Sequence, residues 1–172
     1  MQFLDSNFKK AITPLLRIEG GYVEDADDRG GATKYGISSK SYPNLDIKHL
    51  TVQHAKNIYY KDYWRKHKIH KIRDFELANE IFDTAVNMGG ITSIKFLQRA
   101  LNILNRDNTL YNDLVVDGIM GRNTLFAVSK VEARILLKVV NGIQFTSYLE
   151  IAEKDNSQEK FIRGWINDRV AI

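Results

Sequence analysis

The chain has 172 residues, 44% of them hydrophobic, which is enough to bury one core or two small subdomains that share a core. Its net charge of +4 at pH 7 suits attraction to anionic polymers, both nucleic acids and cell-wall material with acidic peptide stems. It has no cysteine, which excludes disulfides and thiolate chemistry. No segment approaches the roughly 18 apolar residues of a membrane span, and the first ten residues lack the apolar stretch of a signal peptide. We therefore expect synthesis in the cytoplasm and no stable membrane insertion.

The first predicted helix runs from a cap at Asp5 or Ser6 to the glycine pair at 20–21, with apolar residues recurring every three or four positions. Pro14 either kinks this helix or stands at the first position of a shorter one. Both versions leave Glu19 in the last turn.

Residues 22–37 are rich in glycine and aspartate, which predicts a small hairpin or an irregular loop and the only β structure that we expect. The rest of the sequence predicts helices separated by glycines and polar loops. The expected helices run from Thr51 to Trp64, 75–88, Thr92 or Ser93 to about Leu104, from about 123, 132–153 and 158–170. The predicted fold is mainly α with a small β element.

Glu19 suits the role of a general acid. Cleavage of a glycosidic bond near neutral pH needs a carboxylic acid that is still protonated when substrate binds, and a second group that handles the nucleophile on the opposite face. The last turn of a helix is the negative end of its dipole, which raises the pKa of a carboxyl group there, and the neighbouring Ile18 and Tyr22 favour the same shift by desolvation.

Residues 17–37 read RIEGGYVEDADDRGGATKYGI, with Glu19 before two glycine pairs. This segment, with IYYKDYW at 58–64 and FDTAVNMG at 82–89, resembles the glycoside hydrolase family 108 muramidases, lysozyme-like enzymes of the phage endolysin and secretion activator types. The resemblance implies a lysozyme-like fold, with Glu19 at the family's catalytic glutamate. It also implies hydrolysis of the β-1,4 bond between N-acetylmuramic acid and N-acetylglucosamine in peptidoglycan.

The second catalytic group is predicted from spacing. Asp28 lies nine positions after Glu19, and Thr33 lies five positions after Asp28, an order similar to the catalytic arrangement of certain phage lysozymes, with the last gap one residue shorter. That analogy implies that Asp28 and Thr33 flank an attacking water, with Asp28 as the base, and that the reaction inverts the anomeric configuration. Asp25 and Asp27 are rivals for the role of base.

Three further side chains are candidates for substrate binding. Tyr35 either lines the groove or packs in the core, and Tyr63 belongs to an aromatic run whose rings suit the CH faces of sugars. For Tyr59 and Trp64 of the same run, the core is the more frequent place. Asn87 is near a helix end, where its amide either hydrogen-bonds an N-acetyl group or ends the helix.

The C-terminal half has a second resemblance. LQRAL at 97–101 and VDGIMGRNT at 116–124 are similar to the LQ…DGxxG…T pattern of peptidoglycan-binding modules. In those modules the turn at Asp117 is largely structural, with aspartate and threonine closing a loop through side-chain to backbone bonds. We therefore expect a catalytic region over residues 1–90 and a helical peptidoglycan-binding region over residues 91–172, packed on it.

No metal or cofactor is predicted. The segment from Asp25 to Gly30 begins like a calcium loop, but Arg29 stands at a ligand position and Gly36 stands where the bidentate glutamate belongs. The four histidines lack the spacing of a zinc site.

The expected partner is the glycan strand of peptidoglycan and not nucleic acid, because acidic residues dilute the densest basic stretch, at 61–73. We expect the chain to act at the cell wall or periplasm, which would require a holin or a secretion system. A non-catalytic wall-binding or secretion-helper protein is the alternative function.

Overall fold

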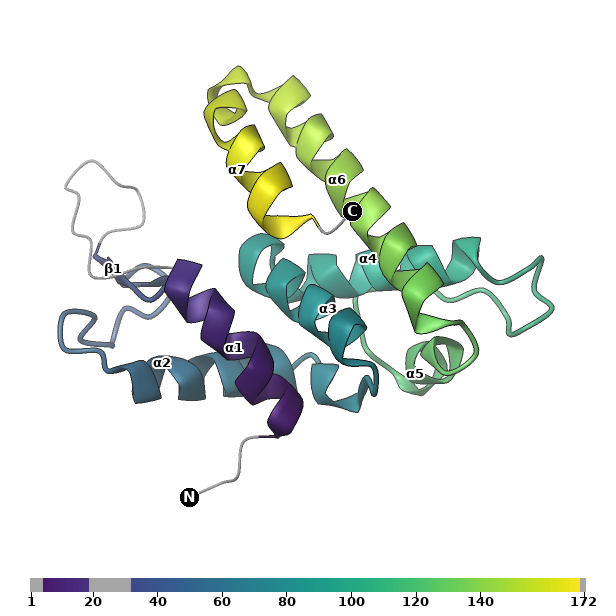
Figure 1. The fold of residues 1–172 in the computed structure, drawn as a ribbon, viewed down its shortest axis with the longest axis horizontal. Coiled ribbons are helices and arrows are strands. Elements are labelled where there is room, and N and C mark those ends of the chain that lie inside the picture. The colour runs from purple at the N-terminus through teal and green to yellow at the C-terminus, as the bar shows by residue number, and fades with distance from the viewer. Residues whose placement is uncertain (1–4, 19–31, 171–172) are drawn as a thin grey trace. The chain divides into compact units, whose positions relative to one another are not determined.

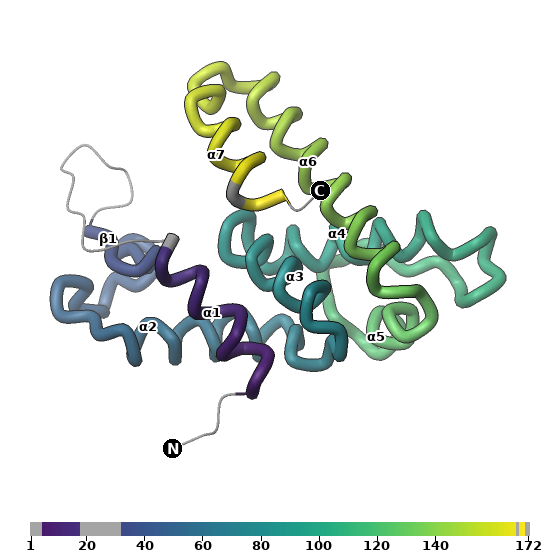
Figure 2. The backbone as a smooth tube through the Cα atoms, viewed as in Figure 1, coloured from purple at the N-terminus to yellow at the C-terminus, as the bar shows by residue number. Residues whose placement is uncertain are grey.

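The computed structural model describes residues 5–18 and 32–170, and the chain divides into two compact units, residues 1–66 and 67–172. Figures 1 and 2 trace the chain from purple at the N-terminus to yellow at the C-terminus. No helix within the described ranges is both long and apolar enough to cross a membrane. The first unit contains α1 (Ser6–Ile18), β1 (Thr33–Lys34), β2 (Ile37–Ser38), α2 (Val52–Tyr59) and the π-helical segment η1 (Tyr60–Arg65).

The start of α1 is held by both oxygens of one carboxylate. The backbone N–H of Phe8 donates to Asp5 Oδ1 (2.7 Å), which is an N-cap, and the indole Nε1–H of Trp64 donates to Asp5 Oδ2 (2.7 Å). The Phe8 ring lies 5.0 Å from the Tyr60 ring and 5.6 Å from that of Trp64. Asp5 therefore joins α1 to η1 at the place where their aromatic side chains pack. Pro14 lies within α1, so one continuous helix forms.

The small β element is an antiparallel hairpin, with Thr33 opposite Ser38 and Lys34 opposite Ile37. Its two turn residues both have positive φ, +53° at Tyr35 and +72° at Gly36, as a type I′ turn requires. The predicted hairpin is confirmed, although Tyr35, a strand-prone residue, stands in the turn.

The helix predicted from Thr51 to Trp64 is present as two consecutive segments. Thr51 caps α2 by accepting from the N–H of His54 (3.2 Å), and the chain then continues as η1, where the N–H of Lys66 bonds the carbonyl of Lys61 (3.1 Å). The wider π turn was not predicted. Trp64 is completely buried, so the core position expected for it is confirmed.

The second unit is helical. Its long helices pack against one another, α3 on α4 and α6, and α4 on α6, while α7 folds back along α6 (Figure 1). A buried hydrogen bond from Ser93 Oγ to the carbonyl of Ile81 (2.6 Å) joins α3 to α4. The elements are η2 (Ile69–Lys71), α3 (Phe75–Met88), α4 (Gly90–Ile103), α5 (Arg122–Val128), α6 (Ala133–Lys154), η3 (Asn156–Gln158) and α7 (Glu159–Arg169).

The start of α4 corrects the sequence prediction, which placed it at Thr92 or Ser93. Gly89, at φ +92°, ends α3, and α4 begins at the next residue, with the N–H of Ser93 bonded to the carbonyl of Gly89 (3.0 Å). The position at Gly90 has no room for a side chain, because a Cβ there would lie 2.0 Å from Nε2 of His67. Glycine therefore lets the two helices follow each other without a connecting loop.

The packing of α3 predicts how fragments behave. Residues 67–172 produced alone should melt cooperatively, whereas residues 91–172 should not, because without α3 the apolar faces of α4 and α6 become exposed. Thermal melts followed by circular dichroism test this pair. Equal, cooperative melts of both fragments would contradict the role given to α3.

Candidate functional site

Glu19 and Asp28, the predicted acid and base, lie outside the described residues, as do the rivals Asp25 and Asp27. The structure describes the elements on either side of them in the sequence. These are α1, which ends at Ile18, and the hairpin that begins at the third predicted residue, Thr33.

The hairpin that contains Thr33 is anchored to α2. The hydroxyl of Tyr59, a side chain that is only 1% exposed, donates to the backbone carbonyl of Tyr35 (2.8 Å). Nζ of Lys34 donates to the carbonyl of Lys48 (2.9 Å) and lies 5.6 Å from the centre of the Tyr35 ring. These bonds hold the turn in its left-handed conformation and so position Thr33 in β1. Tyr35 itself is half-buried.

Tyr63 lies beside this anchor. Its half-buried ring is 5.5 Å from that of Tyr59, whose core position is confirmed. Nearby, the hydroxyl of Tyr42 donates to Asp62 Oδ2 (2.9 Å), and burial together with this hydrogen bond raises the pKa of Tyr42. The first unit thus gathers tyrosines of the loop, α2 and η1 around the hairpin.

Asn87 belongs to the second unit. It is exposed in the last turn of α3, and its amide nitrogen donates to the hydroxyl of Tyr148 on α6. Because Gly89 ends α3 through its positive φ, Asn87 is not needed to terminate the helix.

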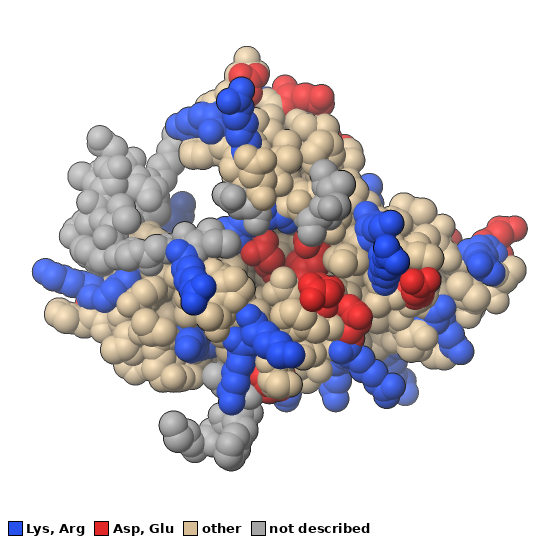
Figure 3. Space-filling model, in the orientation of Figure 1, with Lys and Arg blue, Asp and Glu red and all other residues tan. Residues whose placement is uncertain are grey.

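A buried carboxyl cluster in the second unit was not predicted. Glu80, 7% exposed, accepts from Thr84 Oγ1 (3.2 Å), and Arg169 Nη1 donates to Asp83 Oδ1 (2.7 Å). Burial, with the charge of Asp83, raises the pKa of Glu80 to about 7. Figure 3 shows acidic side chains gathered over α3, whereas lysines and arginines are scattered. The signal in the sequence was a glutamate on the apolar face of a buried helix, which is rare without a partner.

Gln144, fully buried on α6, completes this cluster. Its amide nitrogen donates to Glu80 Oε1 (2.9 Å), and its oxygen lies 3.1 Å from Thr84 Oγ1, whose single hydroxyl hydrogen it shares with Glu80. The ring of Trp165 on α7 stacks on that of Tyr148 at 5.2 Å. Helices α3, α6 and α7 therefore meet around buried polar groups that hydrogen-bond one another.

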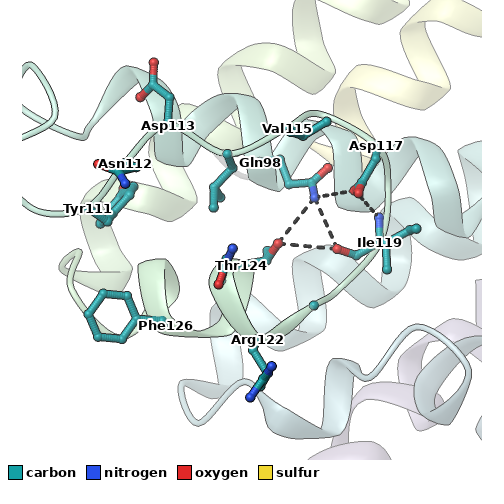
Figure 4. A pocket seen from close by; sticks show the side chains of 13 residues that line it. Gln98, Tyr111, Asn112, Asp113, Val115, Asp117, Ile119, Arg122, Thr124 and Phe126 are labelled. Atoms are coloured by element: carbon teal, nitrogen blue, oxygen red, sulfur yellow. Dashed lines mark hydrogen bonds between the residues drawn. The ribbon is translucent and has the colours of Figure 1, made fainter.

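The loop before α5 is closed around Gln98, a fully buried side chain of α4. Its oxygen accepts from the N–H of Gly118 (2.8 Å). Its nitrogen donates to Asp117 Oδ1 (2.8 Å), the carbonyl of Ile119 (3.2 Å) and Thr124 Oγ1 (3.3 Å), as Figure 4 shows. Asp117 also accepts from the N–H of Ile119 (2.8 Å). The loop-closing role expected of Asp117 and Thr124 is confirmed. Both side chains also bond Gln98, which links them to α4. The hydrogen bond from Gln98 lowers the pKa of Asp117.

Gly118 adds a steric reason for this loop. It has φ +80°, and a Cβ there would lie 2.6 Å from Ile91 Cγ2 and 2.9 Å from the carbonyl oxygen of Ile91. Glycine is therefore required both by conformation and by the close approach of α4. Within the described part of the chain, no three histidine, aspartate or glutamate side chains are grouped to hold a metal.

The mainly α architecture, with a two-stranded hairpin between the first two helices, is a lysozyme-like fold. The family described as "Glycosyl hydrolase 108" matches residues 12–89, and one described as "Predicted Peptidoglycan domain" matches residues 92–170. The chain therefore contains a glycosyl hydrolase 108 region followed by a peptidoglycan domain, and the resemblance seen in the sequence is confirmed. It is a glycosidase by family, and its partner is peptidoglycan.

A solved structure described as "Structure of Brucella abortus SagA" is similar to this chain with a TM-score of 0.73 and 26% sequence identity. The match covers 93% of this chain and 87% of that one, so it includes both matched regions. No protein with a curated description matches the chain.

The raised pKa of Glu80 predicts how stability depends on pH. Between its ordinary value of 4.5 and about 7 the folded chain binds more protons than the unfolded chain, so the free energy of unfolding should fall as pH rises through this window. Each pKa unit corresponds to about 1.4 kcal/mol. Glu80→Gln should flatten this fall and stabilise the protein at pH 8, as measured by urea unfolding.

Glu76→Gln is the matched control, because Glu76 is an exposed residue of the same helix. If the free energies of unfolding of Glu80→Gln and of the parent change in parallel from pH 5 to pH 8, ionisation of Glu80 does not cause the loss of stability with rising pH.

Proposed function

We propose that this protein is an N-acetylmuramidase that hydrolyses the β-1,4 bond between N-acetylmuramic acid and N-acetylglucosamine. The observation that carries the proposal is the order of two regions in one lysozyme-like chain, a glycosyl hydrolase 108 region followed by a peptidoglycan domain. Peptidoglycan offers two alternating β-1,4 bonds. We assign the bond after muramic acid because residues 17–37 resemble the muramidases of this family.

Glu19 is the proposed acid. It follows directly on Ile18, the last residue of α1. The C-terminal end of a helix carries a partial negative charge, which favours the protonated form of a carboxyl group there. The acid donates its proton to the glycosidic oxygen as the bond from C1 to that oxygen breaks. A protonated carboxyl group at neutral pH is the first requirement of this chemistry.

Asp28 is the proposed base, and Thr33 helps to hold the water. The water attacks C1 from the face opposite the leaving sugar, Asp28 takes its proton, and the configuration at C1 inverts. The anchoring of the hairpin through Tyr59 and Tyr35 supports this role of Thr33, because a water-binding hydroxyl must be held still.

We assign the neighbouring groups to substrate binding. Tyr35 and Tyr63 line the groove beside the hairpin, and Asn87 hydrogen-bonds an N-acetyl group. Residues 1–90 form the catalytic region, and residues 91–172 bind the wall. The protein acts as a bacteriolytic enzyme at the cell wall or periplasm. It reaches this compartment through a holin or a secretion system.

The proposal predicts that Glu19→Gln abolishes hydrolysis of purified peptidoglycan and leaves the thermal melt unchanged, because the amide keeps the shape and lacks the transferable proton. Loss of a general acid costs about 10² to 10⁴-fold in rate. Release of soluble muropeptides over time measures this. Near-native hydrolysis by the folded variant would remove Glu19 as the acid, and a parent that binds peptidoglycan without cutting it would be a non-catalytic wall-binding protein.

The assignment of the base predicts a difference among three aspartates. Asp28→Asn should reduce the hydrolysis rate far more than Asp25→Asn or Asp27→Asn, each measured against the same peptidoglycan. Equal losses in all three variants, or a loss at Asp25 alone, would move the base to another residue.

A further inference from the structure

The loop around Gln98 encloses a pocket of about 730 Å³ that lies entirely within the second unit. In Figure 4, Tyr111, Asn112 and Phe126 lie on one side of it and Asp117 and Ile119 on the other.

The walls of this pocket are rigid because amides of α4, and of Asn105 just after it, hold the loop along its length. Besides Gln98, the side chain of Asn102 bonds both the N–H and the carbonyl of Leu114 (2.8 Å each), and Asn105 Nδ2 donates to Asp113 Oδ1 (2.8 Å). The hydroxyl of Tyr111 donates to the carbonyl of Leu101 (2.7 Å). A loop held in this way is ordered before any ligand arrives, which reduces the entropic cost of binding.

These bonds leave several side chains of the lining open to a ligand. Asn112 and Asn123 line the pocket, are exposed, and form no side-chain hydrogen bond with any described residue. Phe126 is 52% exposed, with Lys130 Nζ 4.9 Å from the centre of its ring. Val115 is 78% exposed at the rim. The open groups therefore include two carboxamides, an aromatic ring and an apolar edge.

This combination suits an N-acetylated sugar. An acetamido group offers one N–H and one carbonyl, which carboxamides can bond as both donor and acceptor, and the CH face of a pyranose ring packs on an aromatic ring. The charges disfavour the acidic peptide stem, because the lining contains two carboxylates, Asp113 and Asp117, and one guanidinium, Arg122.

We propose that this pocket is a second glycan-binding site, in which Phe126 contacts the sugar ring and Asn112 and Asn123 bond the acetamido and hydroxyl groups of the glycan strand. The proposal rests on the proposed function only in that the ligand is peptidoglycan. The site would hold a strand through the second unit and needs none of the catalytic residues.

The test is a titration of the full-length Glu19→Gln protein, labelled with ¹⁵N, with glycan strands freed of their peptides by an amidase. Nuclear magnetic resonance resolves the side-chain amides of Asn112 and Asn123, so it reports this pocket separately from any other glycan site. We expect both signals to shift with saturation. Phe126→Ala should weaken the affinity seen at these signals by about tenfold, as loss of a central aromatic contact does.

Phe161→Ala is the matched control. Phe161 is 46% exposed on α7 with Lys160 Nζ 4.8 Å from the centre of its ring, so it resembles Phe126 in exposure and in its neighbouring lysine but lies outside the pocket lining. This variant should bind as the parent does. Should Phe126→Ala fold poorly, Asn112→Ala, in an exposed loop position, makes the same comparison.

Two results would overturn the proposal. If the amide signals of Asn112 and Asn123 do not move at saturating glycan, the strand does not bind here. If they move with free stem peptide and not with peptide-free glycan, the ligand is the peptide. A protein that binds glycan in this pocket but never cleaves peptidoglycan would refute the proposed function and leave this site standing.

Discussion

The arrangement of the first unit depends on the carboxylate of Asp5. One of its oxygens caps α1 and the other holds the indole of Trp64, so a single side chain fixes the start of the helix that leads to Glu19 and ties it to η1. The indole is completely buried, so loss of this acceptor would remove the hydrogen bond that offsets the desolvation of its N–H. Loss of the carboxylate would therefore disturb both the cap and the core contact of α1.

In the second unit, too, buried polar side chains hold elements together, and here there are several of them. Buried amides, and not charges alone, decide where its elements lie. Gln98 closes the loop before α5, and Gln144 joins α6 to the carboxyl group of Glu80 on α3. Each amide both donates and accepts, so one side chain can satisfy partners of both kinds in places where an unsatisfied polar group would be costly. The unit therefore presents loops that buried amides hold on a helical base.

Helix positions could be predicted from the sequence because their signals are local. Thr51 and Asp74 each cap the helix that follows, and Gly89 ends α3 with a positive φ. The start of α4 was placed two or three residues late because a helix that begins at Gly90 has no side-chain cap.

Features that depend on distant partners could not be predicted. The π-helical turn contains Trp64, which bonds Asp5, 59 residues earlier in the chain. The cluster at Glu80 depends on Gln144 of α6 and on the charge of Asp83. Arg169 of α7 forms an ion pair with Asp83. Such contacts leave no periodicity in the sequence. For the candidate site, the sequence correctly assigned the glycosyl hydrolase 108 region and the structural loop at Asp117, whereas the roles of Glu19, Asp28, Thr33, Tyr35, Tyr63 and Asn87 stay predictions.

The central claim is that this glycosidase cuts after N-acetylmuramic acid with water as the nucleophile. Mass spectrometry of the muropeptides released from purified peptidoglycan, with and without borohydride reduction, tests it most directly because the reducing-end sugar identifies the bond. We expect N-acetylmuramic acid at every new reducing end. N-acetylglucosamine ends would mean that the other β-1,4 bond is cut. Anhydro-muramic ends would mean lytic transglycosylase chemistry, which uses an acid without a water-activating base and would remove Asp28 from its role.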